Sequence, residues 1–179
     1  MTRRGLPFLP FVLGLAIGAG ITLTVMPGLI MSRAMDRIET LGGEAGRVRH
    51  APPVTADNQT IVRASPDILY SVCLYDLNDG PLRIEAPWPA DGNYASVSFY
   101  DSNTNNFAAI SDRDAGSATT SIRLFARSAS NVPEETDRSF EAPTQTGLIL
   151  YRRVIDANTD IAAAEAERQA FTCSRMSEQ

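Results

Sequence analysis

Residues 94–101 read YASVSFYD, and every second side chain in this stretch is apolar: Ala95, Val97 and Phe99. An alternation of period two is typical of a β-strand with one buried face. Other stretches share this alternation or an enrichment in Ile, Leu and aromatic residues: 67–77, 82–88, 120–127 and 147–155. The sequence therefore predicts a domain built mainly from strands.

Clusters of turn-forming residues separate these strand candidates, at positions 78–81, 91–93 and 101–106. Short strands joined by polar turns, without amphipathic helices between them, indicate a sandwich or a barrel. One alanine-rich helix is expected at Thr159–Phe171, where it would close the C-terminus against the sheet. We expect an antiparallel β-sandwich over residues 59–179.

An uncharged, mostly apolar stretch precedes this domain, from Gly5 to Ser32. A bilayer core of about 30 Å needs about 20 helical residues, and Phe11–Ile30 supplies them. The alternative is a cleaved signal peptide, but the run is too long for the usual apolar region and no clear A-x-A cleavage site follows it. Residues 1–32 are therefore predicted to be an anchor, with residues 6–31 in contact with lipid.

Gly14 and Gly18 within this anchor have the spacing that lets two membrane helices approach closely and dimerise. Glycine is common in membrane helices in any case, so a homodimer is not the favoured interpretation.

Residues 33–58 are predicted to be a helical stalk and linker, with the helix ending at Gly42-Gly43. The remaining stretch, Glu44–Asn58, contains Pro52-Pro53 and the only histidine, His50. A histidine in a linker is not held beside a nucleophile, so His50 is expected to be inert. We predict no metal site and no cofactor.

The net charge of −5 and the absence of lysine exclude a basic nucleic-acid footprint and a Schiff-base lysine. The two cysteines are Cys73, in a predicted strand, and Cys173, after the predicted helix. In an oxidising compartment they would form a disulfide, which is the prediction made here. Two separate buried thiols are the alternative.

Three ordered blocks of sequence carry a resemblance to a known family: 65–71, 80–87, and 94–101 continued by 104–107. Together they resemble the domain of unknown function 1254 family. The resemblance implies an immunoglobulin-like β-sandwich and exported bacterial relatives, some with a second domain, the domain of unknown function 1214. Ser65 departs from the pattern, because the family usually has Asn at this position.

Arginines flank the apolar stretch on both sides, so charge alone leaves the orientation close to a tie. Exported relatives favour a single-pass protein of the bacterial inner membrane, with a cytoplasmic N-terminus and a periplasmic domain. A separate chain carrying a 1214-type domain is then a reasonable partner.

Three classes of function are compatible with these features. We favour a non-catalytic binding or accessory module. The alternatives are an envelope enzyme using carboxylates at strand ends and a structural subunit that oligomerises through the membrane helix and stalk. Seven residues are candidates for a binding site: Asp67, Tyr70, Tyr94, Tyr100, Asp101, Asn105 and Asn106. Three further carboxylates lie near strand ends and turns: Asp76, Asp112 and Asp114. The alternative is that the aspartates and asparagines shape turns and the tyrosines are ordinary strand residues.

Overall fold

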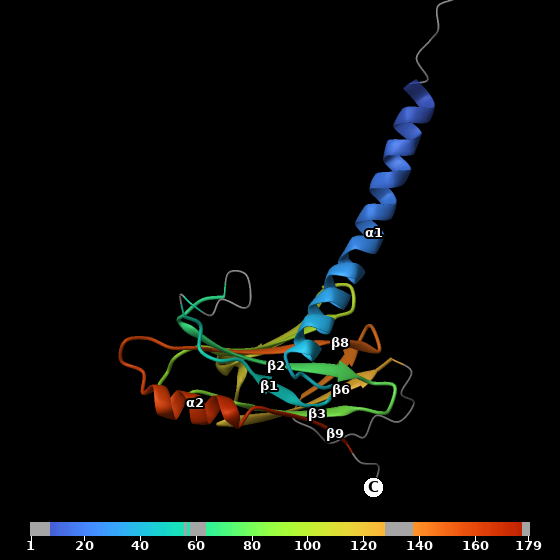
Figure 1. Cartoon of the computed structure of the whole chain (residues 1–179). Helices are drawn as coiled ribbons and strands as arrows, with labels where there is room; N and C mark the ends of the chain where they lie inside the picture. The colour runs from blue at the N-terminus through green and yellow to red at the C-terminus, as the bar shows by residue number, and fades with distance from the viewer. Residues whose placement is uncertain (1–7, 56, 58–63, 128–137, 177–179) are drawn as a thin grey trace, which may run out of the picture.

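The computed structural model describes residues 8–55, 57, 64–127 and 138–176. Its first element is the helix α1, Phe8–Thr40, whose N-terminal part projects away from the rest of the molecule (Figure 1). The helix ends as the sequence predicts, because Gly42 adopts a φ of 91° that side chains with a Cβ rarely allow. The N–H of Gly43 then donates to the carbonyl of Ile38 and closes the last turn.

The strands form two sheets, as predicted. The first is a five-stranded antiparallel sheet in the order β1 (Val48–His50), β2 (Ile68–Asp76), β8 (Thr146–Val154), β4 (Ala95–Asp101) and β5 (Asn106–Ser111). The second is a four-stranded sheet in the order β7 (Arg138–Ala142), β6 (Thr119–Ala126), β3 (Leu82–Pro87) and β9 (Thr172–Arg175). In this second sheet β7 pairs parallel to β6, so the sheet is mixed.

Two short helices complete the domain: a single 3-10 turn, η1 (Asp112–Asp114), and α2 (Ile161–Gln169). The helix α2 lies within the predicted range. It begins at Asp160, whose carboxylate accepts hydrogen bonds from the N–H groups of Ala162 and Ala163. The predicted fold class, mainly β with an N-terminal helix and a short C-terminal helix, is confirmed.

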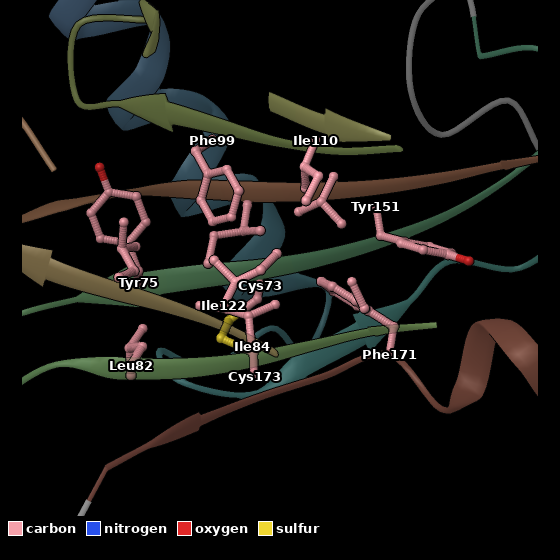
Figure 2. Close-up of a cluster of buried hydrophobic side chains, with 14 of the residues drawn as sticks. Cys73, Tyr75, Leu82, Ile84, Phe99, Ile110, Ile122, Tyr151, Phe171 and Cys173 are labelled. Atoms are coloured by element: carbon pink, nitrogen blue, oxygen red, sulfur yellow. A yellow bond between two sulfur atoms is a disulfide. The ribbon is translucent and has the colours of Figure 1, made fainter. Parts of the chain in front are cut away.

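The hydrophobic core lies between the two sheets (Figure 2). Phe99 and Tyr151 reach it from the five-stranded sheet, and Ile84 and Ile122 from the other. These side chains have no measurable exposure, because alternate residues of each strand point inward. Burial of apolar area between the sheets is the main favourable contribution to folding here.

A disulfide between Cys73 of β2 and Cys173 of β9 connects the two sheets through this core (Figure 2). The Cα atoms lie 6.5 Å apart, within the usual range for a disulfide. Of the two alternatives that the sequence leaves open, the structure contains the paired form.

The expected linker over Glu44–Asn58 needs correction, because Val48–His50 form β1. This strand pairs with β2, and its N-terminal flank adds a hydrogen bond from the N–H of Gly46 to the carbonyl of Leu74. A three-residue strand carries no recognisable period in the sequence, so only its pairing identifies it. Only residues 41–47 therefore connect the end of α1 to the first strand of the sandwich.

Candidate functional site

The helix α1 presents its apolar side chains outward. Leu9, Phe11 and Leu23 are each more than 70% exposed, and none of the apolar window of this helix is buried. Among the described residues, Leu9–Thr40 is the one helix long and apolar enough to cross a membrane. Exposed aliphatic side chains over such a length are unfavourable in water, so the helix is a candidate membrane anchor.

The C-terminal half of α1 packs against the sandwich. Met31 is buried, in contrast to its neighbours Ile30 and Leu29, which are more than half exposed. A Cβ added to Gly28 would lie 3.5 Å from Asn103 Oδ1, so the turn between β4 and β5 contacts the helix here. The anchor and the domain are thus in direct contact rather than separated by a spacer.

A small pocket opens at this junction. Its walls come from α1 and from the starts of the β4–β5 turn and β8: Gly28, Met31, Ser32, Met35, Asp36, Glu39, Ser102 and Thr146. Its volume of about 160 Å³ is below the ~300 Å³ at which small-molecule sites usually begin. The pocket therefore offers space for a few water molecules rather than a substrate.

The predicted site residue Asp101 lies buried at the start of the β4–β5 turn. Its carboxylate accepts hydrogen bonds of 2.8 Å from the N–H groups of Asn103 and Asn105 and from Asn105 Nδ2. Thr104 between them has a φ of 67°, in the left-handed region. Asp101 and Asn105 thus stabilise a strained turn. This is the structural role that the sequence analysis gives as the alternative to ligand binding.

The other predicted site residues lie elsewhere on the five-stranded sheet. Asn106 is exposed at the start of β5, and Tyr100 points away from the core. The hydroxyl of Tyr70 accepts a hydrogen bond of 3.1 Å from the N–H of Ser65. This contact fixes the tyrosine ring against the segment that leads into β2.

Asp67 and Tyr94 flank the C-terminal end of β8. The carbonyl of Asp67 accepts from the N–H of Ile155, and that of Tyr94 from the N–H of Val154. Tyr94 and Asp101 lie at opposite ends of β4, about 23 Å apart at 3.3 Å per residue. The seven predicted residues are therefore divided between two ends of the sheet and do not form one site, and their role in binding stays a prediction.

The remaining candidate carboxylates hold local backbone structure. Asp76 accepts from the N–H of Asn78, Asp112 from the N–H of Ala95, and Asp114 from the N–H and hydroxyl of Ser111. The hydrogen bonds from Ser111 lower the pKa of Asp114 below its ordinary value. A general acid needs a raised pKa, so this arrangement does not favour acid catalysis at Asp114.

Sequence reasoning misses a polar cluster around His50. In β1 this ring is held with Nδ1 2.8 Å from Ser71 Oγ of β2. Buried Arg168 of α2 donates to the carbonyls of Ala51 and Tyr70 and pairs with Glu165. The expectation of an unfixed histidine in a linker is therefore wrong.

Chemistry of the Ser–His type is nevertheless disfavoured at His50. Burial, and next the charge of Arg168, lower the pKa of the imidazole below 6.5. Ser71 has no exposed surface, so no substrate reaches its hydroxyl. The cluster instead joins β1, β2 and α2.

A second buried cation, Arg153 of β8, is also compensated. Its Nη2 lies 2.8 Å from Asp91 Oδ2 and 3.0 Å from Glu167 Oε2, and its Nη1 donates to the carbonyl of Val154. Paired charges of this kind hold α2 and the β3–β4 loop to the sheet. Within the described part of the chain, no three His, Cys, Asp or Glu side chains gather as a metal site requires.

Comparisons with known proteins give a family and a fold. Residues 45–175 match the model of the family described as "Protein of unknown function (DUF1254)". The VPA0106 protein from Vibrio parahaemolyticus, a solved structure, is similar with a TM-score of 0.64 and 14% identity, over 88% of this chain and 36% of that one. A putative uncharacterized protein from Burkholderia cenocepacia is similar with a TM-score of 0.49 and 13% identity, over 73% of this chain and 34% of that one.

No curated protein matches the chain. The chain spans about a third of the length of the two solved structures. The likeness to the VPA0106 protein, at 14% identity, shows the fold alone.

Proposed function

Since this chain belongs to the DUF1254 family of proteins of unknown function, we propose a role from its architecture: a membrane-anchored β-sandwich that binds or supports a partner chain and has no chemistry of its own. The observation that carries this proposal is α1, whose apolar side chains are exposed along a length that suits a bilayer. In the lipid they would be covered without any protein partner.

The disulfide supports a location outside the cytoplasm. Cys73 and Cys173 are paired in the core of the domain, and disulfides persist in oxidising compartments such as the bacterial periplasm. We therefore place the N-terminus in the cytoplasm, α1 in the bacterial inner membrane and the sandwich in the periplasm. Arg3 and Arg4 before the helix fit this orientation, but the arginines after the helix offset them, so the disulfide carries the argument.

The size of the solved relatives suggests what kind of partner to look for. This chain corresponds to about a third of the VPA0106 chain. We propose that a separate chain with a 1214-type domain binds this sandwich. A role as a carboxylate enzyme is less well supported, because hydrogen bonds hold Asp101 and Asp114 in local turns.

The test compares the full chain with a truncated variant beginning at Gly43, which keeps β1. The full chain should stay with membranes in alkaline carbonate, and the truncated chain should be released. Protease added to spheroplasts should digest the sandwich only if it faces the periplasm. Crosslinking on membranes should capture one specific partner. Release of the full chain by carbonate contradicts the anchor, and substrate turnover by the truncated chain contradicts the non-catalytic role.

A further inference from the structure

We propose that the outer face of the five-stranded sheet is a lipid-facing surface, held against the headgroup layer of the membrane with the β4–β5 turn nearest to it. The outer face is the set of side chains on this sheet that point away from the core. This inference rests on the proposed anchoring by α1. It adds that the domain itself contacts the lipid headgroups, in addition to being tethered by α1.

The contact between α1 and the β4–β5 turn fixes the height of the domain. Gly28 lies in the last part of the uncharged stretch, and an added Cβ there would be 3.5 Å from Asn103 Oδ1 and 3.9 Å from the carbonyl oxygen of Ser102. The first charged residue after Gly28 is Arg33. A span of about 20 residues that begins at Leu9 or Phe11 ends between Gly28 and Ile30, so Asn103 lies level with the membrane boundary.

The direction in which α1 leaves the domain decides which sheet faces the bilayer. In Figure 1 the helix rises from the side of β2 and β8, while β3 and β9 lie on the opposite side of the sandwich. Met35 of α1 and Thr146 at the start of β8 line the same pocket. The outer face of the five-stranded sheet is thus turned toward the membrane, and that of the four-stranded sheet is turned away.

The composition of the outer face suits this position. On β2 and β8 it includes four aliphatic or aromatic side chains that are half-buried: Tyr70, Val72, Leu148 and Leu150. Leu74, between them, is already covered by the chain itself. Strands with apolar residues on both faces are typical of sheets covered on both sides. The four-stranded sheet instead carries charges on its outer side, including the ion pair of Arg83 with Glu85.

Arg152 of β8 lies on the outer face, and among the described residues it forms no ion pair with a carboxylate. Its Nη2 donates to Ser98 Oγ at 3.0 Å, and its Nε is buried without a hydrogen-bond partner among the described residues. On the opposite sheet Arg83 pairs with Glu85 at 2.6 Å. An arginine without a counter-ion beside an apolar sheet surface is complementary to lipid phosphate groups.

The experiment uses the full chain in vesicles of phosphatidylcholine and phosphatidylglycerol and measures quenching of tryptophan fluorescence by a nitroxide on the lipid headgroup. The wild-type chain, whose single Trp88 is buried, gives the baseline. Asn103→Trp probes the turn and Leu150→Trp the outer face, with Val72→Trp as a second variant on that face. Arg83→Trp is the matched control on the four-stranded sheet.

We expect a larger loss of fluorescence for Asn103→Trp and for the outer-face variants than for Arg83→Trp. A fourth variant, Leu13→Trp, reports insertion of the anchor through quenching by lipids brominated on the acyl chain. If Leu13→Trp is quenched but the outer-face variants match Arg83→Trp, the proposed contact of the outer face with the membrane is wrong. The proposed anchoring by α1 is then still supported. If Leu13→Trp is not quenched, the proposed anchoring itself fails.

Discussion

His50 of β1 and Ser71 of β2 lie opposite each other in the five-stranded sheet, with His50 Nδ1 2.8 Å from Ser71 Oγ. Burial, and next the charge of Arg168, lower the pKa of His50 below its ordinary value of 6.5, while Glu165 acts in the opposite direction. The imidazole is thus neutral in the folded chain under conditions in which an unfolded chain would begin to bind a proton. This pair makes the first segment after the anchor sensitive to pH.

We predict that the folded chain loses stability as the pH falls below about 6.5, because protonation of His50 is easier in the unfolded state. The loss should grow until the pH passes the lowered pKa of the folded state. Thermal unfolding of the full chain in detergent, from about pH 7.5 to about pH 5.5, measures it. The variant His50→Gln cannot titrate there and should show a flatter profile. Identical profiles for the two chains would contradict this assignment.

Removal of the disulfide should destabilise the domain strongly. Cys73 and Cys173 are 100 residues apart in sequence, and a cross-link over such a loop restricts the unfolded chain by about 4–5 kcal/mol in the loop-entropy model. We expect the double variant Cys73→Ala, Cys173→Ala to unfold at a clearly lower urea concentration than the wild type. Reductant should lower the midpoint of the wild type and leave that of the double variant unchanged. An unaffected wild type would mean that the bond contributes nothing.

The strands with a period of two were predictable, because the alternation of apolar and polar residues within each strand already shows which face is buried. Phe99 of β4 alternates with polar neighbours, and the structure places it in the core. The strands β1 and β9 were not predictable, since β9 reads only Thr172–Arg175 and is defined by its pairing with β3. Such short strands depend on pairing with residues that are distant in sequence, so a local sequence pattern does not reveal them.

The same distinction applies to the candidate site. Asp101 and Asn105 are four residues apart and shape a turn, a role that local chemistry suggests. Arg168, by contrast, donates to the carbonyl of Ala51 across 117 residues of sequence. The contact of Gly28 with the β4–β5 turn is similarly long-range. Contacts that position the domain on its anchor therefore required the structure.

Gly147 at the start of β8 should not tolerate a side chain. A Cβ there would overlap the carbonyl oxygen of Tyr100 and the phenol ring of Tyr75, and neither a strand backbone nor a core ring moves easily. We expect Gly147→Ala to lower the free energy of unfolding by about 1–3 kcal/mol. The matched control is Gly116→Ala, which meets no atom within 4 Å and should change stability by less than about 0.5 kcal/mol. Equal effects in urea unfolding would contradict the packing described for Tyr75.

Arg153 should contribute far more to stability than an exposed arginine with the same kind of partner. Its side chain is 2% exposed and pairs with Asp91 and Glu167, whereas the side chain of Arg127, paired with Glu141, is 86% exposed. Burial opposes ionisation of Asp91, but the hydrogen bond from Arg153 and those within the loop outweigh it and lower the pKa of this carboxyl. Removal of the guanidinium therefore leaves two carboxylates without their counter-ion.

We expect Arg153→Met to cost about 1–3 kcal/mol, because it leaves two hydrogen-bonded, partly buried carboxylates without their charged partner. Arg127→Met removes the same charge from a solvated pair and should cost less than about 1 kcal/mol. Urea unfolding of the two variants, followed by far-UV circular dichroism, measures the difference. Equal midpoints would show that water reaches the Arg153 cluster and compensates its charges, and α2 would then be held to the sheet by packing alone.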